Sequence, residues 1–176
     1  MAIVFSALVI SACESKVTPD DGASEALAAA EAKIAEMANY DAHIAAADAW
    51  IEAWDSGVVD GLDAVAHSSY TRTAPDFNAG SLDELKAFIQ QVHQTYPDFS
   101  ITNDGMAAGP DGVFLQWTVT GTDTGRGENA TGNSMQVTGI SRMQFSDGKV
   151  ARELVIFDTG TALTQLDTAE LPHTAN

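Results

Sequence analysis

The spacing of apolar residues predicts two long helices in the first part of the chain. Between residues 41 and 56 these positions recur three and four residues apart, the period of a helix with one buried face; they are Ile44, Ala47, Trp50, Ile51 and Trp54. A second helix begins at Ser81, which forms a capping box with Glu84. Its apolar face consists of Leu82, Leu85, Phe88, Ile89 and Val92, and Pro97 ends it.

Beyond Pro97 the period changes from that of a helix to that of a strand. Apolar and polar residues alternate over 113–120, and strand-like runs follow at 135–145 and 150–157. Turn residues at 109–112 and 146–149 separate these runs, so we expect the strands to form one antiparallel sheet. Helices followed by a run of strands is the order of an α+β fold.

The remaining segments carry weaker signals. Residues 60–66 predict a short helix, and residues 24–40, rich in Ala, Glu and Lys, predict a helical stalk that breaks at residues 39–41. Residues 13–23 are polar and predict a tether, and residues 167–176 predict a loose tail.

The first residues are similar to the signal peptide of a bacterial lipoprotein. A short apolar run over 2–10 is followed by small residues immediately before Cys13, the only cysteine. This resemblance implies removal of residues 1–12, lipidation of Cys13, and anchoring at the periplasmic or extracytoplasmic face of a bacterial cell envelope. The pattern lacks the usual basic residue near the start, and an apolar helix or core strand that ends in cysteine is the alternative.

The strong negative charge of the chain argues against nucleic acid as a partner. It has 25 acidic against 8 basic residues and a formal net charge of -17, so we expect no binding to nucleic acid, which requires clustered Lys or Arg. We interpret the acidity as a solvated surface. The spacings of His and Cys match no metal motif, and we expect neither a metal nor another cofactor.

Several short segments, in order, carry a family resemblance. They are residues 49–57 (AWIEAWDSG), 95–99 (TYPDF), 121–125 (GTDTG), 147–158 (DGKVARELVIFD) and 163–166 (LTQL). Over residues 41–166 the chain resembles the SnoaL-like polyketide cyclases, or ester cyclases, of the nuclear-transport-factor-2-like superfamily. The resemblance implies a cone-shaped α+β fold, in which a curved antiparallel sheet wraps around three N-terminal helices and encloses an apolar pocket.

In that family an aspartate near the end of the last long strand acts as acid and base, and Asp158 matches its place. A carboxylate in an apolar cone loses hydration, which raises its pKa and makes proton transfer useful at neutral pH. Alternation along the strand puts Leu154 on the face of Asp158, but the opposite face, with Glu153, is also fairly apolar. The alternative is that Asp158 caps the turn that follows it.

Other residues are candidates for the pocket wall or for orienting a carbonyl oxygen. Where the family often has histidine in its Gly-Thr-His turn, this chain has Asp123, so the family's full site is not present. Each remaining candidate has a structural alternative, as a core or surface residue. These candidates are Tyr70, His67, His93, Trp50, Trp54 and Trp117.

Two functions are compatible with the sequence. One is a cofactor-independent cyclase or isomerase that uses Asp158 on a small hydrophobic carbonyl compound. The other is a non-catalytic envelope lipoprotein that binds a hydrophobic small molecule or a protein. Family relatives often form homodimers through the outer sheet face, where we expect Gln116, Thr118 and Thr120.

Overall fold

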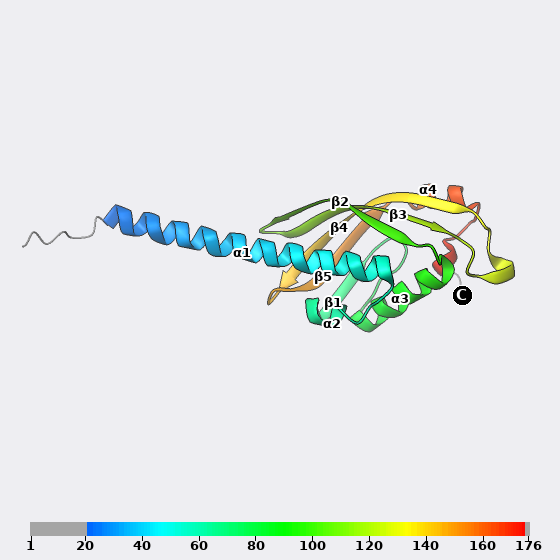
Figure 1. Cartoon of the computed structure of the whole chain (residues 1–176), viewed down its shortest axis with the longest axis horizontal. Coiled ribbons are helices and arrows are strands. Elements are labelled where there is room, and N and C mark those ends of the chain that lie inside the picture. The colour runs from blue at the N-terminus through cyan, green and yellow to red at the C-terminus, as the bar shows by residue number, and fades with distance from the viewer. Residues whose placement is uncertain (1–20, 175–176) are drawn as a thin grey trace, which may run out of the picture. The chain divides into compact units, whose positions relative to one another are not determined.

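The computed structural model describes residues 21–174, which form four α-helices, five strands and two 3-10 turns (Figure 1). The predicted signal peptide, Cys13 and most of the tether lie outside the described residues. The elements in order are α1 (Asp21–Ser56), α2 (Leu62–Val65), β1 (Ala66–Thr73), α3 (Leu82–Thr95), β2 (Ser100–Gly109), β3 (Gly112–Thr122), η1 (Gly127–Asn129), β4 (Ser134–Ser146), β5 (Lys149–Phe157), α4 (Thr159–Leu166) and η2 (Pro172–Thr174).

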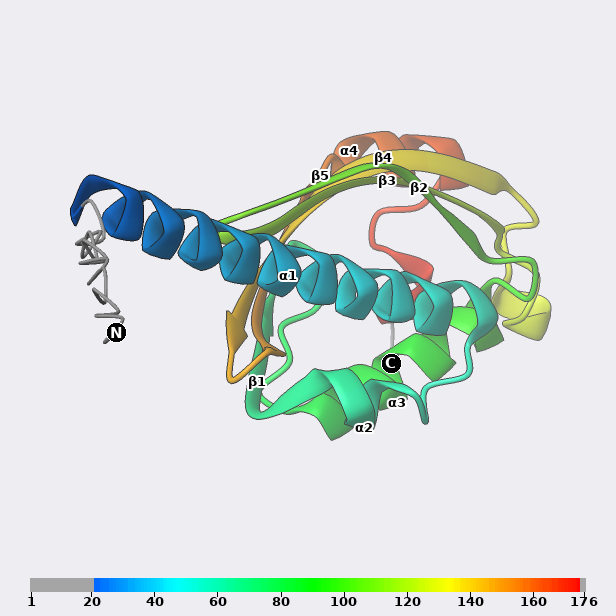
Figure 2. The ribbon, with the colours of Figure 1, turned by 60° about the vertical axis from the view of Figure 1, so that its left-hand side comes forward.

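The strands form one curved sheet in the order β1-β5-β4-β3-β2 (Figure 2). The expected α+β class and the curved sheet are confirmed, but the sheet is not wholly antiparallel, because β1 pairs with β5 in parallel. The predicted helix over 60–66 is helical only at Leu62–Val65, and β1 follows it. The strand β1 was not predicted because it lacks the usual alternation of apolar and polar residues. Its inward positions include Tyr70 and Arg72, which are polar or charged.

The helix α1 is continuous, so the break predicted at residues 39–41 is wrong. Its Ala-rich sequence favours helix, and the exposed Tyr40 hydroxyl donates a hydrogen bond to Glu36 one turn earlier. Among the described residues, 21–35 and 36–174 belong to two separate units, divided between residues 35 and 36. Among residues 21–174 no helix has the length and apolarity needed to cross a membrane.

Within residues 36–174 the apolar faces of α1 and α3 pack against the concave face of the sheet. Trp50 on α1 and Ile89 on α3 are fully buried, as their helical spacing predicts. Ser81 caps α3 by accepting a hydrogen bond from the Glu84 amide at 3.3 Å. The Glu84 carboxylate accepts from the amide of Gly80 rather than that of Ser81, so the expected capping box is shifted by one residue.

The tail predicted to be loose is ordered as far as residue 174. Asp167 ends α4 in a left-handed conformation, and the chain then turns back so that Leu171 and His173 are buried. Tyr96 binds the His173 ring at 3.0 Å from a position 77 residues earlier. The loose tail was predicted from the polar composition of residues 167–176. The burial of Leu171 and His173 depends instead on contacts with residues distant in the sequence.

Candidate functional site

A cavity of about 70 Å³ lies between the concave face of the sheet, α1, α3 and the C-terminal segment. Most of its wall is apolar, and its aromatic members include Trp50, Trp54, Tyr96, Phe99, Trp117 and Phe157. Five further lining side chains are polar or charged: Arg72, Asp76, Ser141, Glu153 and His173. A mostly apolar cavity with a few convergent polar groups is typical of small-molecule sites.

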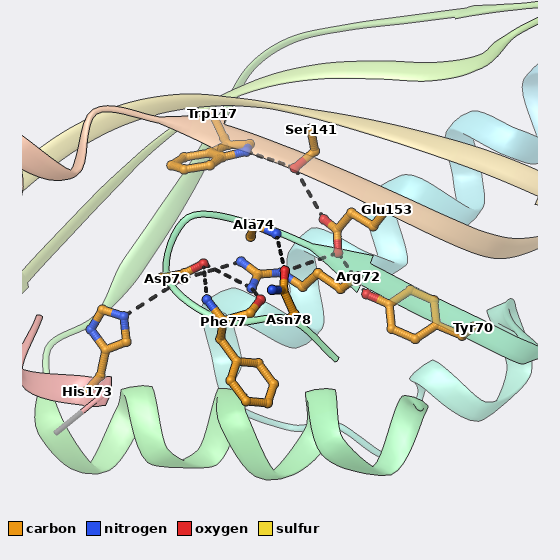
Figure 3. Close-up of polar contacts among 10 residues, drawn as sticks. All are labelled: Tyr70, Arg72, Ala74, Asp76, Phe77, Asn78, Trp117, Ser141, Glu153 and His173. Atoms are coloured by element: carbon orange, nitrogen blue, oxygen red, sulfur yellow. Dashed lines mark hydrogen bonds and ion pairs between the residues drawn. The ribbon is translucent and has the colours of Figure 1, made fainter. Parts of the chain in front are cut away.

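Glu153 on β5 is the centre of the polar groups (Figure 3). Its side chain is 4% exposed, its Oε2 accepts a hydrogen bond from the Tyr70 hydroxyl at 2.9 Å, and its Oε1 accepts from Ser141 at 3.2 Å. Ser141 in turn accepts from the indole N–H of Trp117 at 3.1 Å. Two other strands, β1 and β4, therefore supply the groups that hold this carboxyl, and β3 supplies the indole behind them.

Burial raises the pKa of the Glu153 carboxyl above its ordinary value. The Arg72 charge and the hydrogen bonds from Tyr70 and Ser141 act in the opposite direction, but burial outweighs them. Burial also raises the pKa of the Tyr70 hydroxyl, so Tyr70 stays a neutral donor. A carboxyl with a raised pKa exchanges protons closer to neutral pH than an exposed glutamate does.

A buried ion pair lies beside Glu153. Arg72 donates from Nη1 to Asp76 at 3.0 Å and to the Phe77 carbonyl at 2.5 Å, while its Nε lies 3.8 Å from Glu153 Oε2. His173 Nε2 lies 3.8 Å from Asp76 on the other side (Figure 3). Burial alone would raise the pKa of Asp76, but its contacts with His173 and Arg72 outweigh this and lower it.

The structure brings some of the predicted pocket residues together. Trp50, Trp54 and Trp117 line the cavity, and Tyr70 contacts Glu153 directly. Trp117 has room for its ring because its partner on β4 is Gly139, where any Cβ would collide with the indole.

Other predicted residues lie elsewhere. His93 binds the Trp54 carbonyl at 2.8 Å and does not line the cavity, whereas His67 lies at the surface beside Ser69. Asp123 is buried, and its carboxylate accepts a hydrogen bond from Arg126 at 2.6 Å. This contact lowers the pKa of Asp123 and links two residues of the segment between β3 and β4. Leu154 is 40% exposed on the outer face, so its expected place in the pocket is wrong.

Asp158 does not have the apolar surroundings expected of it. It is exposed, and its carboxylate caps α4 by accepting from the Gly160 amide at 2.9 Å and from the Thr161 hydroxyl at 2.7 Å. The bonds from Thr161 lower its pKa. The inner face of β5 is instead that of Glu153, Val155 and Phe157, the alternative that alternation alone left open.

The sequence contained only a weak signal for the groups that do meet. Glu153 is a charged residue alternating with Val155 and Phe157, a pattern of a polar side chain directed inward. Arg72 and Asp76 lie in and after a strand that was not predicted, and His173 lies in the segment expected to be loose. Within residues 21–174 no group of three or more His, Cys, Asp or Glu side chains is arranged to hold a metal ion.

Comparison with known proteins shows which family and which solved structures this chain resembles. Residues 47–153 match the model of the SnoaL-like domain family. None of the curated proteins matches the sequence. The chain is similar in structure to TsrD from Streptomyces laurentii, with 23% identity, a TM-score of 0.64, and coverage of 72% of this chain and 95% of that one.

Two further solved structures are similar. IdmH from Streptomyces antibioticus, a candidate polyketide cyclase, has 20% identity and a TM-score of 0.61, over 72% of this chain and 99% of that one. TerC, co-crystallised with polyporic acid, has 15% identity and a TM-score of 0.60, over the same 72% and 99%. At these identities the structural likeness shows the fold, which confirms the cone-shaped fold expected from the sequence.

Replacing Glu153 by glutamine is expected to remove one pH dependence of stability. Because burial raises the pKa of Glu153 above 4.5, the folded protein keeps a proton that the unfolded chain has released. The free energy of unfolding of the wild type therefore falls as pH rises from 4.5 through the raised pKa, and this fall is absent in Glu153→Gln. Denaturant unfolding across this range measures it; identical pH profiles for the two proteins would contradict the assignment.

Proposed function

Because the chain belongs to the SnoaL-like domain family, we propose that it is a cofactor-independent acid–base enzyme of the cyclase or isomerase type. Its substrate is a small hydrophobic carbonyl compound, and Glu153 is the group that moves the proton. The observation that supports this most is a buried carboxyl on the wall of an apolar cavity, with a pKa raised by burial.

The chemistry follows from the contacts of Glu153. As a carboxylate it accepts a proton from the carbon next to the carbonyl group, and as an acid it returns that proton to the rearranged product. Hydrogen bonds from Tyr70 and Ser141 fix the orientation of the carboxyl, so little rearrangement is needed during transfer. The aromatic wall keeps water away from the carbanion or enolate that forms.

Glu153 is a better candidate than Asp158 for this role. An exposed carboxylate that caps a helix has a lowered pKa and is a weak base. Asp158 also does not line the cavity, in which an apolar substrate would be held.

A second candidate function is binding without catalysis, as an envelope lipoprotein. Both carboxylate oxygens of Glu153 already accept a hydrogen bond, so the group also fits a purely structural role in a ligand-binding cavity. TerC, which shares the fold, has been crystallised with polyporic acid. Under this alternative, neutralising Glu153 leaves binding intact and there is no activity to lose.

Proton exchange at a carbon next to a carbonyl group tests the enzyme proposal. We expect the protein to accelerate deuterium uptake from D₂O into 2-tetralone, followed by NMR. Glu153→Gln is expected to lower this rate by about 10²- to 10⁴-fold, the usual contribution of a general base. The wild-type rate should rise with pH through the raised pKa of Glu153, because only the carboxylate accepts a proton.

Asp158→Asn is the matched control for this experiment. It neutralises the carboxyl that follows the end of β5 and caps α4, and because asparagine caps a helix about as well as aspartate, it should leave both the fold and the exchange rate unchanged. Loss of exchange in Asp158→Asn alone would return the role to Asp158. No acceleration by the wild type would favour the binding protein.

We also propose a homodimer through the outer face of the sheet. Phe114, Ile140, Leu154 and Ile156 are 40–61% exposed there, and Ile140 pairs directly with Ile156. A two-fold axis through this patch would cover it with its own copy. Ile156→Lys is expected to give a monomer in sedimentation experiments, whereas Val58→Lys, an exposed apolar residue outside the sheet, should not; an unchanged Ile156→Lys dimer would contradict this interface.

Lipid anchoring at Cys13 remains a proposal from the sequence. In a bacterial host, the intact chain is expected in the membrane fraction after a high-salt wash, because acyl chains rather than charge would hold it there. Cys13→Ala removes the acylated atom and is expected to shift the protein to the soluble fraction. Equal membrane retention of both proteins would argue for an uncleaved apolar segment instead.

A further inference from the structure

We infer that the indole Nε1 of Trp50 and the Nε of Arg72 form an oxygen-binding subsite in the cavity, which takes the carbonyl or enolate oxygen of the ligand. This inference rests on the proposed function only for the kind of ligand. It concerns binding of an oxygen and does not require that Glu153 catalyse a reaction.

Both donors are buried and lack a hydrogen-bond partner. Trp50 is 0% exposed and Arg72 is 4% exposed, and both residues line the cavity. Among the described residues, one other buried side-chain nitrogen or oxygen lacks a hydrogen-bond partner, Nδ1 of His43, and His43 does not line the cavity. Because an unpaired buried donor is costly, two of them on residues of one cavity indicate an acceptor that a ligand supplies.

Both residues are linked to the proposed base, Trp50 through Tyr70 and Arg72 directly. The Trp50 ring lies 5.0 Å from the Tyr70 ring, and Tyr70 donates to Glu153 Oε2. The same oxygen lies 3.8 Å from Arg72 Nε, a distance that gives an ion pair but no hydrogen bond. The other two nitrogens of Arg72 already bind Asp76, so Nε is the one nitrogen of this guanidinium without a partner.

The charges around this subsite match the movement of a proton. When a C–H bond next to the carbonyl breaks, the proton goes to Glu153, the electron pair forms a C=C bond, and the carbonyl oxygen becomes an enolate. Negative charge thereby moves from the carboxylate to the ligand oxygen. The guanidinium of Arg72 is beside the carboxylate and stabilises either location of that charge, while Trp50 adds a hydrogen bond to the oxygen.

A pair of probes of similar shape separates oxygen binding from packing. 4-Nitrophenolate mimics an enolate, and 4-nitrotoluene has a methyl group in place of its oxygen. We expect Trp50→Phe to weaken 4-nitrophenolate binding about tenfold or more, the usual effect of losing a hydrogen bond to a charged group. Binding of 4-nitrotoluene should change by less than about twofold, because the aromatic wall is largely kept.

Trp54→Phe is the matched control, since it makes the same change on the cavity wall at an indole that is not a buried unpaired donor. It should not discriminate between the probes. Equal losses for both probes in Trp50→Phe, no loss for either, or no binding of 4-nitrophenolate to the wild type would overturn the subsite.

A measurement on the wild-type chain covers the case in which Trp50→Phe fails to fold. The three indole N–H resonances can be assigned by elimination from Trp54→Phe and Trp117→Phe. 4-Nitrophenolate is expected to move the Trp50 resonance downfield, together with Arg72 Nε–H, and 4-nitrotoluene is not; unmoved resonances would overturn the subsite. Deuterium exchange is scored separately, so a selective probe response without exchange would retain the subsite and reject the enzyme.

Discussion

The burial of one carboxyl, that of Glu153, is the constraint on which the rest of the site depends. An ionisable group inside an apolar cavity is tolerated only when hydrogen bonds and an opposite charge replace its lost hydration. Tyr70, Ser141 and Arg72 make these contacts from two other strands, and Arg72 requires Asp76 in turn. The polar groups of the cavity are therefore one connected system built around a single buried carboxyl.

Two parts of the fold that the sequence did not predict, the strand β1 and the C-terminal segment, contribute side chains to these polar groups. The parallel strand β1 carries Tyr70 and Arg72 beside β5, which carries Glu153, so a pairing at the sheet edge assembles acid, donor and cation. The C-terminal segment brings His173 to Asp76 and Tyr96, and Leu171 to the apolar wall. Both segments are rich in polar residues, yet their side chains complete the cavity.

The carboxyl groups of this acidic protein lie in contrasting environments, which shift their pKa values in opposite directions. Asp158 and Asp98 are exposed and accept hydrogen bonds that lower their pKa, which suits them to capping and turn formation. Glu153 has the opposite environment, and burial raises its pKa. Glu153 thus differs from these exposed acids both in its surroundings and in the direction of its pKa shift.

The sequence by itself determined the elements whose signals are local. The face of α3, its serine cap and the alternation of β3 follow from neighbouring residues, and the family segments indicated the cone. Only the tertiary structure decided which face of β5 points inward, that β1 is a strand, and that the C-terminal segment is buried. The reason is distance along the chain: Tyr70 and Glu153 are 83 residues apart, and Tyr96 and His173 are 77 apart, so no local pattern records that they meet.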